Sequence, residues 1–290
     1  MEKAVSQFKD FVQSQHHDSY AAIQQADHRG HVVAITGASS GIGKAIAVSY
    51  GRCGVSALVL IARRPLDDVK STVIAASVAA GHSPPEVMTV AANVADETSI
   101  YLAATKVKET LGHIDILVNN AGRVGTWGNV EAGEAQDWWQ TWEVNIKGVY
   151  LTTRAFIPML LQGKQKTIVN IGSMGVVSPV ANLSAYLPSK LALIQFTNIV
   201  ALEYSSQGLV AFTAYPGDVA TELTGSFPEA MSPYFVDTPE LPGDSIAWLT
   251  QRRLEWLSGR FVSLRWDLPE LVSRQSEIVE GDKLRVTMRV

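Results

Sequence analysis

The stretch TGASSGIG, residues 36–43, stands between an apolar run, VVAI at 32–35, and the helical pattern KAIAVSYGRC at 44–53. Glycine is needed where the backbone takes positive φ and where a pyrophosphate must approach the main chain. The helix behind such a turn points free N–H groups and a positive dipole at the phosphates. A tight strand–helix turn is the simpler alternative, but a strand before the glycines and a helix after them favour nucleotide binding.

Short β-branched apolar runs recur along the chain between longer helical stretches. Near-continuous apolar runs indicate strands that are buried on both faces, as in a parallel sheet. Alternation of strands and helices then predicts an α/β fold, a Rossmann-like doubly wound parallel sheet of about seven strands with helices on both faces. The predicted strands are His31–Thr36, Ala57–Ala62, Val87–Ala92, Ile114–Asn119, Thr167–Gly172, Leu209–Tyr215 and Arg260–Ser263. The predicted helices cover about 42–53, 67–80, 96–111, 134–162, 186–207 and 243–258.

The chain shows no internal repeat and no Gly/Ser linker, which predicts one Rossmann domain over residues 31–265. Residues 1–30 are expected to form a packed or frayed N-terminal extension, and residues 266–290 a C-terminal tail. The segment 218–245 is Pro-rich and too long for a simple connection, so we expect a substrate loop or lid.

Composition limits the possible classes of protein. Hydrophobic residues make up 47% of the 290 residues and charged residues 18%, which fits a globular chain. A net charge of −4 gives no electrostatic footprint for nucleic acid or an acidic membrane. No uncharged apolar run approaches the ~18 residues of a membrane span, and the N-terminus lacks the apolar core of a signal peptide. The single cysteine, Cys53, favours a reducing compartment, so we expect a cytoplasmic protein. The histidines show no metal-ligand spacing, so no metal is expected.

The segment YLPSK, residues 186–190, places a phenol and an ammonium one helical turn apart. Because proline is tolerated only in the first turn of a helix, Pro188 predicts that the helix begins close to Tyr186. Lys190 then lies near the positive end of the helix dipole, where a cation is mildly disfavoured. An unfavourable cation beside a phenol indicates a chemical role for the pair.

Six ordered motifs together resemble the short-chain dehydrogenase/reductase family. The glycine spacing G-x-x-x-G-x-G is the family's, and so are the other five motifs. These are Asn119-Asn120-Ala121-Gly122, Asn145 in VNIKG, Ser173 in NIGSM, the pair Tyr186 and Lys190, and the run from Tyr215 to Thr221. The resemblance covers about residues 30–265, and the two ends are similar to those of members from filamentous fungi. Taken singly, each motif residue has an ordinary structural explanation, but the six motifs in this order cannot be explained in that way.

The resemblance implies a role for each catalytic residue. Tyr186 would be the general acid or base of carbonyl–alcohol interconversion, and Lys190 would lower its pKa from about 10 and hold the nicotinamide ribose. Ser173 would stabilise the substrate oxygen, and Asn145 would hold a water that relays protons to Lys190.

The cofactor is predicted to be NADP(H). An NAD enzyme usually carries an acid about 20 residues past the glycines, but here the sequence reads Arg63-Arg64, which suits a 2′-phosphate. One departure from the family is Asn93, where an aspartate is usual, so a modest loss of adenine affinity is expected. The predicted cofactor-binding residues are Gly37, Ser39, Ser40, Gly41, Ile42, Gly43, Arg63, Arg64, Asn93, Val94, Asn119, Ala121, Gly122, Tyr186, Lys190, Pro216, Gly217, Val219 and Thr221.

The sequence therefore predicts an NADP(H)-dependent oxidoreductase in fungal secondary metabolism. Phe227, Met231, Tyr234 and Phe235 in the substrate loop favour a medium-sized apolar carbonyl or alcohol substrate. Apolar faces on helices 134–162 and 186–207, which pair across a two-fold axis in the family, predict a homodimer or homotetramer. The alternative is a family-like protein that binds the cofactor in a non-redox role, as a sensor, scaffold or cyclase.

Overall fold

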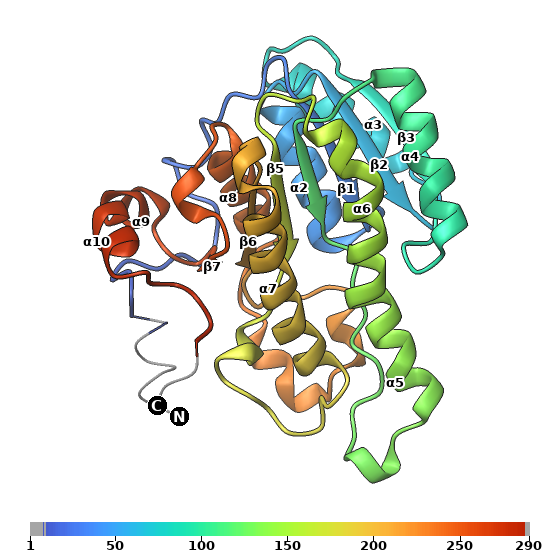
Figure 1. Cartoon of the computed structure of the whole chain (residues 1–290), viewed down its shortest axis with the longest axis vertical. Coiled ribbons are helices and arrows are strands. Elements are labelled where there is room, and N and C mark those ends of the chain that lie inside the picture. Colours follow the sequence, from blue (N-terminus) through green and yellow to red (C-terminus); the bar gives the residue numbers. More distant parts are fainter. Residues whose placement is uncertain (1–7, 9, 288–290) are drawn as a thin grey trace.

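A computed structural model describes residue 8 and residues 10–287 (Figure 1). Its centre is one sheet of seven parallel strands in the order β3-β2-β1-β4-β5-β6-β7, so the predicted fold class is confirmed. After β3 the chain crosses back over the sheet to β4, which lies beside β1, and ligands of such folds bind at the carboxyl ends of the strands at this switch point. The strands are β1 (Val32–Thr36), β2 (Ala57–Ala62), β3 (Glu86–Ala91), β4 (Ile116–Asn119), β5 (Thr167–Ile171), β6 (Val210–Tyr215) and β7 (Phe261–Ser263).

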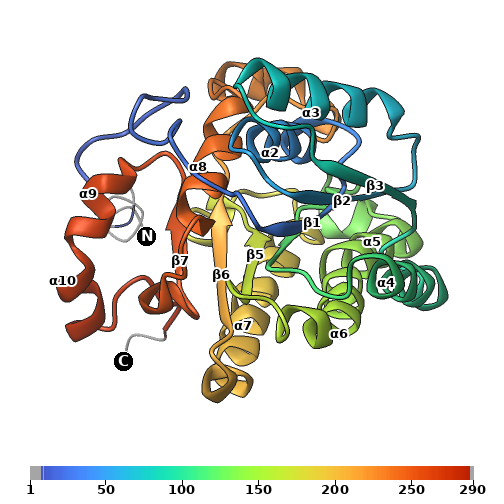
Figure 2. The ribbon, with the colours of Figure 1, turned by 90° about the horizontal axis from the view of Figure 1, so that it is seen from above.

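Helices cover both faces of the sheet (Figure 2). One layer holds α2, α3 and α8, and the other holds α4, α6 and α7. The helices are α2 (Gly41–Arg52), α3 (Asp67–Ala79), α4 (Glu97–Leu111), α5 (Ala135–Trp142), α6 (Gly148–Leu160), α7 (Tyr186–Glu203), α8 (Glu240–Thr250), α9 (Leu268–Ser273) and α10 (Gln275–Glu280).

The two layers share the buried side chains of each strand alternately, as the two-residue period of a strand requires. In β1, Val33 and Ile35 join the core under α2 and α8, whereas Val32 and Ala34 join the core under α4 and α6. This is why the central strands read as continuous apolar runs in the sequence.

The helix predicted over 134–162 is found as one uninterrupted helical run, which consists of α5, a π-helical turn over Glu143–Lys147 that contains Asn145, and α6. The sequence did not predict the π-helical turn. Such turns insert one extra residue and are frequent at functional sites. The helix predicted over 243–258 is wrong at both ends, since α8 starts at Glu240 and stops at Thr250. The side chain of Gln251 donates to the carbonyl oxygen of Trp248 at 3.0 Å and so satisfies one of the carbonyls that the helix end exposes.

Both ends of the described chain pack on the central domain. Val12 and Ile23 of the extension are fully buried in the same core as Leu268 and Ile278 of the tail. The backbone of Ser14–His16 pairs with that of 265–267, because Asp267 N donates to Ser14 O at 2.9 Å and His16 N to Arg265 O at 2.7 Å. The described part of the extension is therefore packed. None of the helices within 10–287 is long and apolar enough to cross a membrane.

Candidate active site

The glycine-rich turn is held tightly at the carboxyl end of β1. Gly37 has φ +66°, and a Cβ there would lie 2.9 Å from Cα of Ala121. A Cβ on Gly43 would lie only 2.3 Å from the carbonyl oxygen of Gly37, so α2 packs against the turn at a distance that only glycine permits. Asn120, which was not predicted to be a site residue, donates to the carbonyl oxygens of Thr36 at 3.0 Å and Gly37 at 3.2 Å. The turn is thereby fixed to the end of β4, at the start of the helix whose N–H groups would face a phosphate.

Arg64 extends from the end of β2 across this turn. Its guanidinium donates to the hydroxyl of Ser40 at 2.5 Å and to that of Ser39 at 3.3 Å. A third contact, at 2.7 Å, pairs it with Glu222 of the substrate loop. Both predicted arginines are exposed, and Arg64 is the one whose guanidinium contacts the turn. The sequence did not indicate Glu222, because nothing in its local pattern showed that the loop reaches the turn.

Two asparagines next to the site are engaged by the protein itself. Asn93 Oδ1 accepts from the backbone N–H of Ala95 at 3.2 Å and closes a turn after β3. Asn119 is 2% exposed, and its amide donates to Thr153 and to Asn170. The side chain of Asn119 therefore joins β4 to β5 and α6, and its predicted contact with the cofactor stays a prediction.

Tyr186 and Lys190 lie at the start of α7, where Pro188 is the third helical residue, as predicted. Lys190 is 4% exposed, its Nζ donates to the carbonyl oxygen of Ile171 at 2.8 Å, and it lies 5.7 Å from the centre of the Tyr186 ring. Ser173, directly after β5, is hydrogen-bonded to Tyr186. Its hydroxyl oxygen also accepts from the N–H of Gly175 at 3.3 Å. The three predicted catalytic side chains are thus brought together.

Burial dominates the electrostatics of this pair. It raises the pKa of Tyr186 to about 12, although the hydrogen bond with Ser173 lowers that pKa, and it lowers the pKa of Lys190 to about 8. The protein alone therefore raises the pKa of Tyr186, whereas the sequence predicted a lowered pKa. Desolvation of the phenol outweighs the hydrogen bond with Ser173, and the charge of Asp218 raises the pKa of Tyr186 further.

Asn145 projects from the π-helical turn toward the same place. Its amide donates to the carbonyl oxygen of Arg123 and to the hydroxyl of Ser189, both at 2.9 Å, and its Oδ1 accepts from Arg123 N at 2.9 Å. A Cβ on Gly122 would lie 3.6 Å from Asn145 Oδ1 and 3.7 Å from Lys190 Nζ. Asn145 therefore joins the end of β4 to α7 beside the lysine. Its predicted role in holding a water stays a prediction.

The segment after β6 closes the site from the opposite side. Thr221 packs on the glycine turn, since a Cβ on Gly41 would lie 3.1 Å from its methyl group. Val94 packs likewise on Gly148 of α6, where a Cβ would lie 2.9 Å from it. Of the remaining predicted residues, Ile42 is the second residue of α2, Ala121 follows β4, and Pro216, Gly217 and Val219 lie in the segment after β6.

Tyr186 packs against an apolar cluster that we call the loop cluster. Its buried members are Val124, Leu183 and Leu187, and Leu223 and Phe227 of the substrate loop pack on it. Phe227 contacts both Trp127, with ring centres 5.4 Å apart, and Phe235, with ring centres 5.6 Å apart. Trp127 was missed because it lies in an irregular segment without periodicity. Tyr234 is 64% exposed and lies outside the cluster.

The sheet, the glycine turn at its switch point and the Ser–Tyr–Lys group define a dinucleotide-dependent oxidoreductase site. Within 10–287, no group of His, Cys, Asp and Glu side chains could hold a metal ion. The chain belongs to the short-chain dehydrogenase family, whose sequence profile matches residues 31–232. It is thus an oxidoreductase of the class that binds NAD(P)H.

Relatives from filamentous fungi are similar over almost their whole length. The short chain dehydrogenase citE of Monascus ruber is 45% identical over 280 residues, 96% of this chain and 96% of that one. The short chain dehydrogenase pigC of the same species is 39% identical, over 96% of this chain and 93% of that one.

Solved structures share the fold. Levodione reductase matches with a TM-score of 0.73 at 23% identity, over 82% of this chain and 97% of that one. A 3-ketoacyl-(acyl-carrier-protein) reductase from Brucella melitensis, complexed with NADH, matches with a TM-score of 0.70 at 25% identity, over 81% and 96%. A short chain dehydrogenase from Shigella flexneri, complexed with NADP, matches with a TM-score of 0.71 at 22% identity, over 83% and 99%.

Proposed function

We propose that the protein is an NADP(H)-dependent reductase that converts a medium-sized apolar ketone into a secondary alcohol in fungal secondary metabolism. The observation that carries the proposal is the position of Tyr186, hydrogen-bonded to Ser173 and next to the buried Lys190, directly beneath the loop cluster. A proton donor is thereby placed next to an apolar surface. The similarity to dehydrogenases of Monascus supports the secondary-metabolism context.

The residues of the site fit a dinucleotide. A Cβ at Gly37 or Gly43 would collide with the backbone of the turn or of Ala121, so only glycine permits this turn at the start of α2, where backbone N–H groups would hold a phosphate. Lys190 is buried with its ammonium close to Gly122 at the end of β4, and it would hold the ribose hydroxyls of the cofactor. When bound, the nicotinamide supplies the hydride.

Preference for the 2′-phosphate form is argued from Arg64. Its guanidinium is held by two serine hydroxyls at the edge of the turn, and three donors of this kind, one guanidinium and two hydroxyls, suit a phosphate dianion. No acid stands in the segment Ala62–Leu66, where an NAD enzyme would place the partner of the ribose 2′-hydroxyl.

The protein's own groups then divide the chemistry. The Ser173 hydroxyl donates a hydrogen bond to the ketone oxygen and stabilises the negative charge that develops as the carbonyl carbon accepts hydride. The Tyr186 phenol transfers its proton to that oxygen, which completes the alcohol and leaves a phenolate. Because burial keeps the phenol protonated at neutral pH, we expect the reductive direction to be favoured.

Lys190 acts on the phenolate after the proton has moved. A phenolate within about 6 Å of an ammonium in a buried site is stabilised strongly by the cation. The raised pKa of Tyr186 and the lowered pKa of Lys190 both apply to the state in which the phenol is neutral and no ion pair exists. Once the phenolate forms beside Lys190, it also stabilises the charged form of the lysine. Solvent then returns the proton to Tyr186.

The test is Tyr186→Phe, which keeps the ring in the loop cluster and deletes the hydroxyl. NADPH oxidation with 9,10-phenanthrenequinone and a panel of cyclic apolar ketones should fall by about 10²–10⁴-fold. The Kd for NADPH and the melting temperature should change little. Tyr101→Phe, which alters a 66% exposed tyrosine on α4, is the matched control and should retain full turnover. Wild-type turnover in a folded Tyr186→Phe protein would favour the non-redox alternative.

A further inference from the structure

The base of the substrate loop is tied together by one buried carboxylate. Asp237, where the loop returns toward α8, has a fully buried side chain. Its backbone N–H donates to the carbonyl oxygen of Asp218 at 3.1 Å, and its Oδ2 accepts from the N–H of Asp218, directly after Gly217. Asp237 also forms a parallel bridge with Val219. The two ends of the loop are therefore joined side by side where it leaves β6.

Gly217 is part of this joint. It has φ +97°, and a Cβ there would lie 2.6 Å from Oδ2 of Asp237. The Pro216–Thr221 run, whose Thr221 packs on the glycine turn, thus takes its path from its contact with Asp237. Moving the carboxylate would move the wall of the cofactor site.

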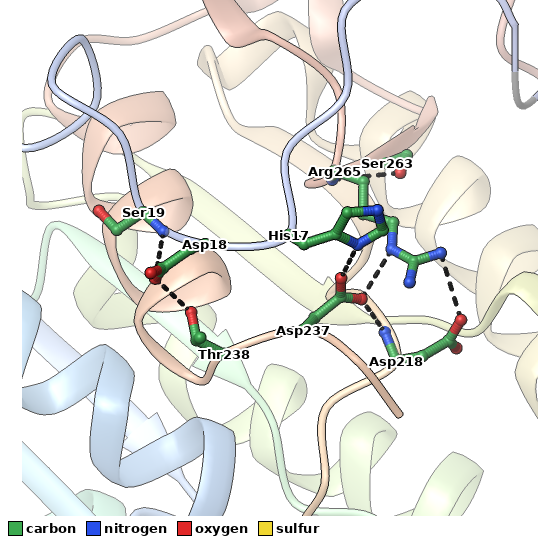
Figure 3. A network of polar contacts seen from close by, with 8 residues as sticks. All are labelled: His17, Asp18, Ser19, Asp218, Asp237, Thr238, Ser263 and Arg265. Atoms are coloured by element: carbon green, nitrogen blue, oxygen red, sulfur yellow. Dashed lines mark hydrogen bonds and ion pairs between the residues drawn. The ribbon is translucent and has the colours of Figure 1, made fainter. Parts of the chain in front are cut away.

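Two side chains from distant parts of the chain hold Asp237 in place (Figure 3). Arg265, just past β7, donates from Nε to Asp237 Oδ2 at 2.7 Å and pairs through Nη1 with Asp218 at 3.3 Å. His17 of the N-terminal extension donates from Nδ1 to Asp237 Oδ1 at 2.6 Å. Both carboxylate oxygens are therefore satisfied, as a buried charge requires.

The extension adds further contacts at the same point. The carbonyl oxygen of His17 accepts from the N–H of Thr238 at 2.9 Å, and the carboxylate of Asp18 accepts from the Thr238 hydroxyl at 2.6 Å. Figure 3 shows this segment crossing the return of the loop. His17, Asp237 and Arg265 all lie outside residues 31–232, the part that matches the family profile.

We propose that His17, Asp237 and Arg265 form a loop clamp, in which the N-terminal extension fixes the base of the substrate loop and so positions the nicotinamide side of the cofactor site. The three are positioning residues, because they act through Gly217, Asp218 and Thr221. The proposal rests on the proposed function for the identity of the ligand. A fixed base would keep the wall behind the cofactor in place during any movement of the exposed tip of the loop.

The experiment uses His17→Ala in the full chain, since removal of Asp237 or Arg265 would strand a buried charge and threaten folding. Hydrogen–deuterium exchange should become about tenfold faster at the amides of Asp218, Asp237 and Thr238, which the clamp now protects. The Kd for NADPH should rise severalfold. His17→Asn, whose amide can donate from near the position of Nδ1, should restore both values.

His16→Ala is the matched control. His16 contacts Asp267 at 3.1 Å and stacks on Tyr20, away from the loop, so its loss weakens the extension without touching the clamp. The proposal is overturned if exchange at the three amides is unchanged in His17→Ala, or if His16→Ala accelerates it equally. A wild-type protein that does not bind NADPH, yet shows the exchange response to His17→Ala, would refute the proposed function alone and leave the clamp standing.

Discussion

The ammonium of Lys190 donates to the carbonyl oxygen of Ile171, the last residue of β5, at 2.8 Å in a pocket that leaves the lysine 4% exposed. A buried ammonium with one carbonyl partner is poorly solvated, which is why its pKa is lowered to about 8. The site thus keeps a charge that costs stability at neutral pH and becomes useful when a phenolate forms beside it.

Lys190→Met is therefore expected to stabilise the protein while it abolishes turnover and weakens NADPH binding. The folded pKa lies below the unfolded value of 10.5, so the cost is full below pH 8 and disappears as the pH rises from 8 to 10.5. From the pKa shift, the free energy of unfolding gained by removing the ammonium is at most about 3 kcal/mol. The carbonyl of Ile171, which loses its partner, offsets about 1–3 kcal/mol of that gain.

Urea unfolding at pH 7 and pH 10 checks this expectation. The stability gain of Lys190→Met over wild type should be larger at pH 7 than at pH 10, whereas Lys106→Met on the exposed side of α4 should show no such difference. A stability difference between Lys190→Met and wild type that is the same at both pH values would contradict the explanation by a buried charge.

Much of this site could be predicted from sequence because its signals are local. Pro188 fixed the start of α7, and the glycines fixed the turn after β1, so the motif residues converge as expected. The sign of the Tyr186 pKa shift could not be predicted, because it depends on how much apolar surface the loop cluster places over the phenol.

The parts that sequence reasoning missed depend on long-range contacts. The π-helical turn at Asn145 looks like ordinary helix in the sequence, and its shape serves contacts with Arg123 and Ser189 far along the chain. The ion pair of Arg64 with Glu222 and that of Arg265 with Asp237 likewise join segments that no local pattern connects. The strands were easier to predict, since burial on both faces leaves an apolar run that can be read locally.

Arg64→Ala should raise the Kd for NADPH by about 10–100-fold, the usual effect of losing hydrogen bonds to a charged group, and leave the Kd for NADH nearly unchanged. Arg63→Ala should have a smaller effect, because only Arg64 is held at Ser39 and Ser40. Fluorescence titration with both cofactors gives the four values. A wild-type Kd for NADH at or below that for NADPH would refute the assignment of NADP(H).

Glu222→Gln tests the same site from the loop. Glu222 pairs with the Arg64 guanidinium at 2.7 Å and so competes with a bound 2′-phosphate for it. Removing the negative charge should lower the Kd for NADPH severalfold, with no gain for NADH. Equal gains for both cofactors would show that Glu222 acts on the loop in general and not on the phosphate.

His28 is expected to make the protein acid-sensitive. It is buried and donates from Nε2 to the carbonyl oxygen of Ala247 at 2.8 Å, so its Nδ1 accepts from Nδ1 of His31 at 3.0 Å. Nε2 of His31 in turn accepts from the amide of Gln165 at 3.0 Å, which leaves both rings neutral. Burial lowers the pKa of His28 to about 4.

The sign follows from the unfolded pKa of about 6.5. Below pH 6.5 His28 binds a proton in the unfolded chain but stays neutral in the folded protein until about pH 4. About 3 kcal/mol of stability is therefore lost between pH 6.5 and pH 4. Compared with the wild-type protein, His28→Gln should be less stable at pH 7.5 but should lose less stability on acidification. Urea unfolding at pH 7.5, 5.5 and 4.5 distinguishes them. Parallel losses in wild type and His28→Gln would exclude His28 as the cause.

An exposed aromatic groove on α5 and α6 is expected to form a subunit interface. It is lined by Trp139, Trp142, Ile146 and Tyr150 and also by the charged residues Glu143 and Lys147. Trp139 is 61% exposed and Tyr150 47% exposed. Leu202 on α7 is 62% exposed, and the Tyr150 ring meets Phe196 of α7 at 6.5 Å, so the apolar surface spans both helices. Apolar patches of this kind on a monomer mark interaction sites, and a second copy with the same patch would cover it across a two-fold axis.

Light scattering at micromolar concentration should therefore give wild-type particles of at least twice 31.4 kDa. Tyr150→Asp places a charge in the groove and should shift the mass toward 31.4 kDa, because an unpaired charge in an apolar interface is costly. Tyr101→Asp, at a 66% exposed position on α4 away from the groove, should leave the assembly intact. A wild-type mass of one chain would contradict the predicted dimer or tetramer, and a dimer that persists in Tyr150→Asp would place its interface on another face.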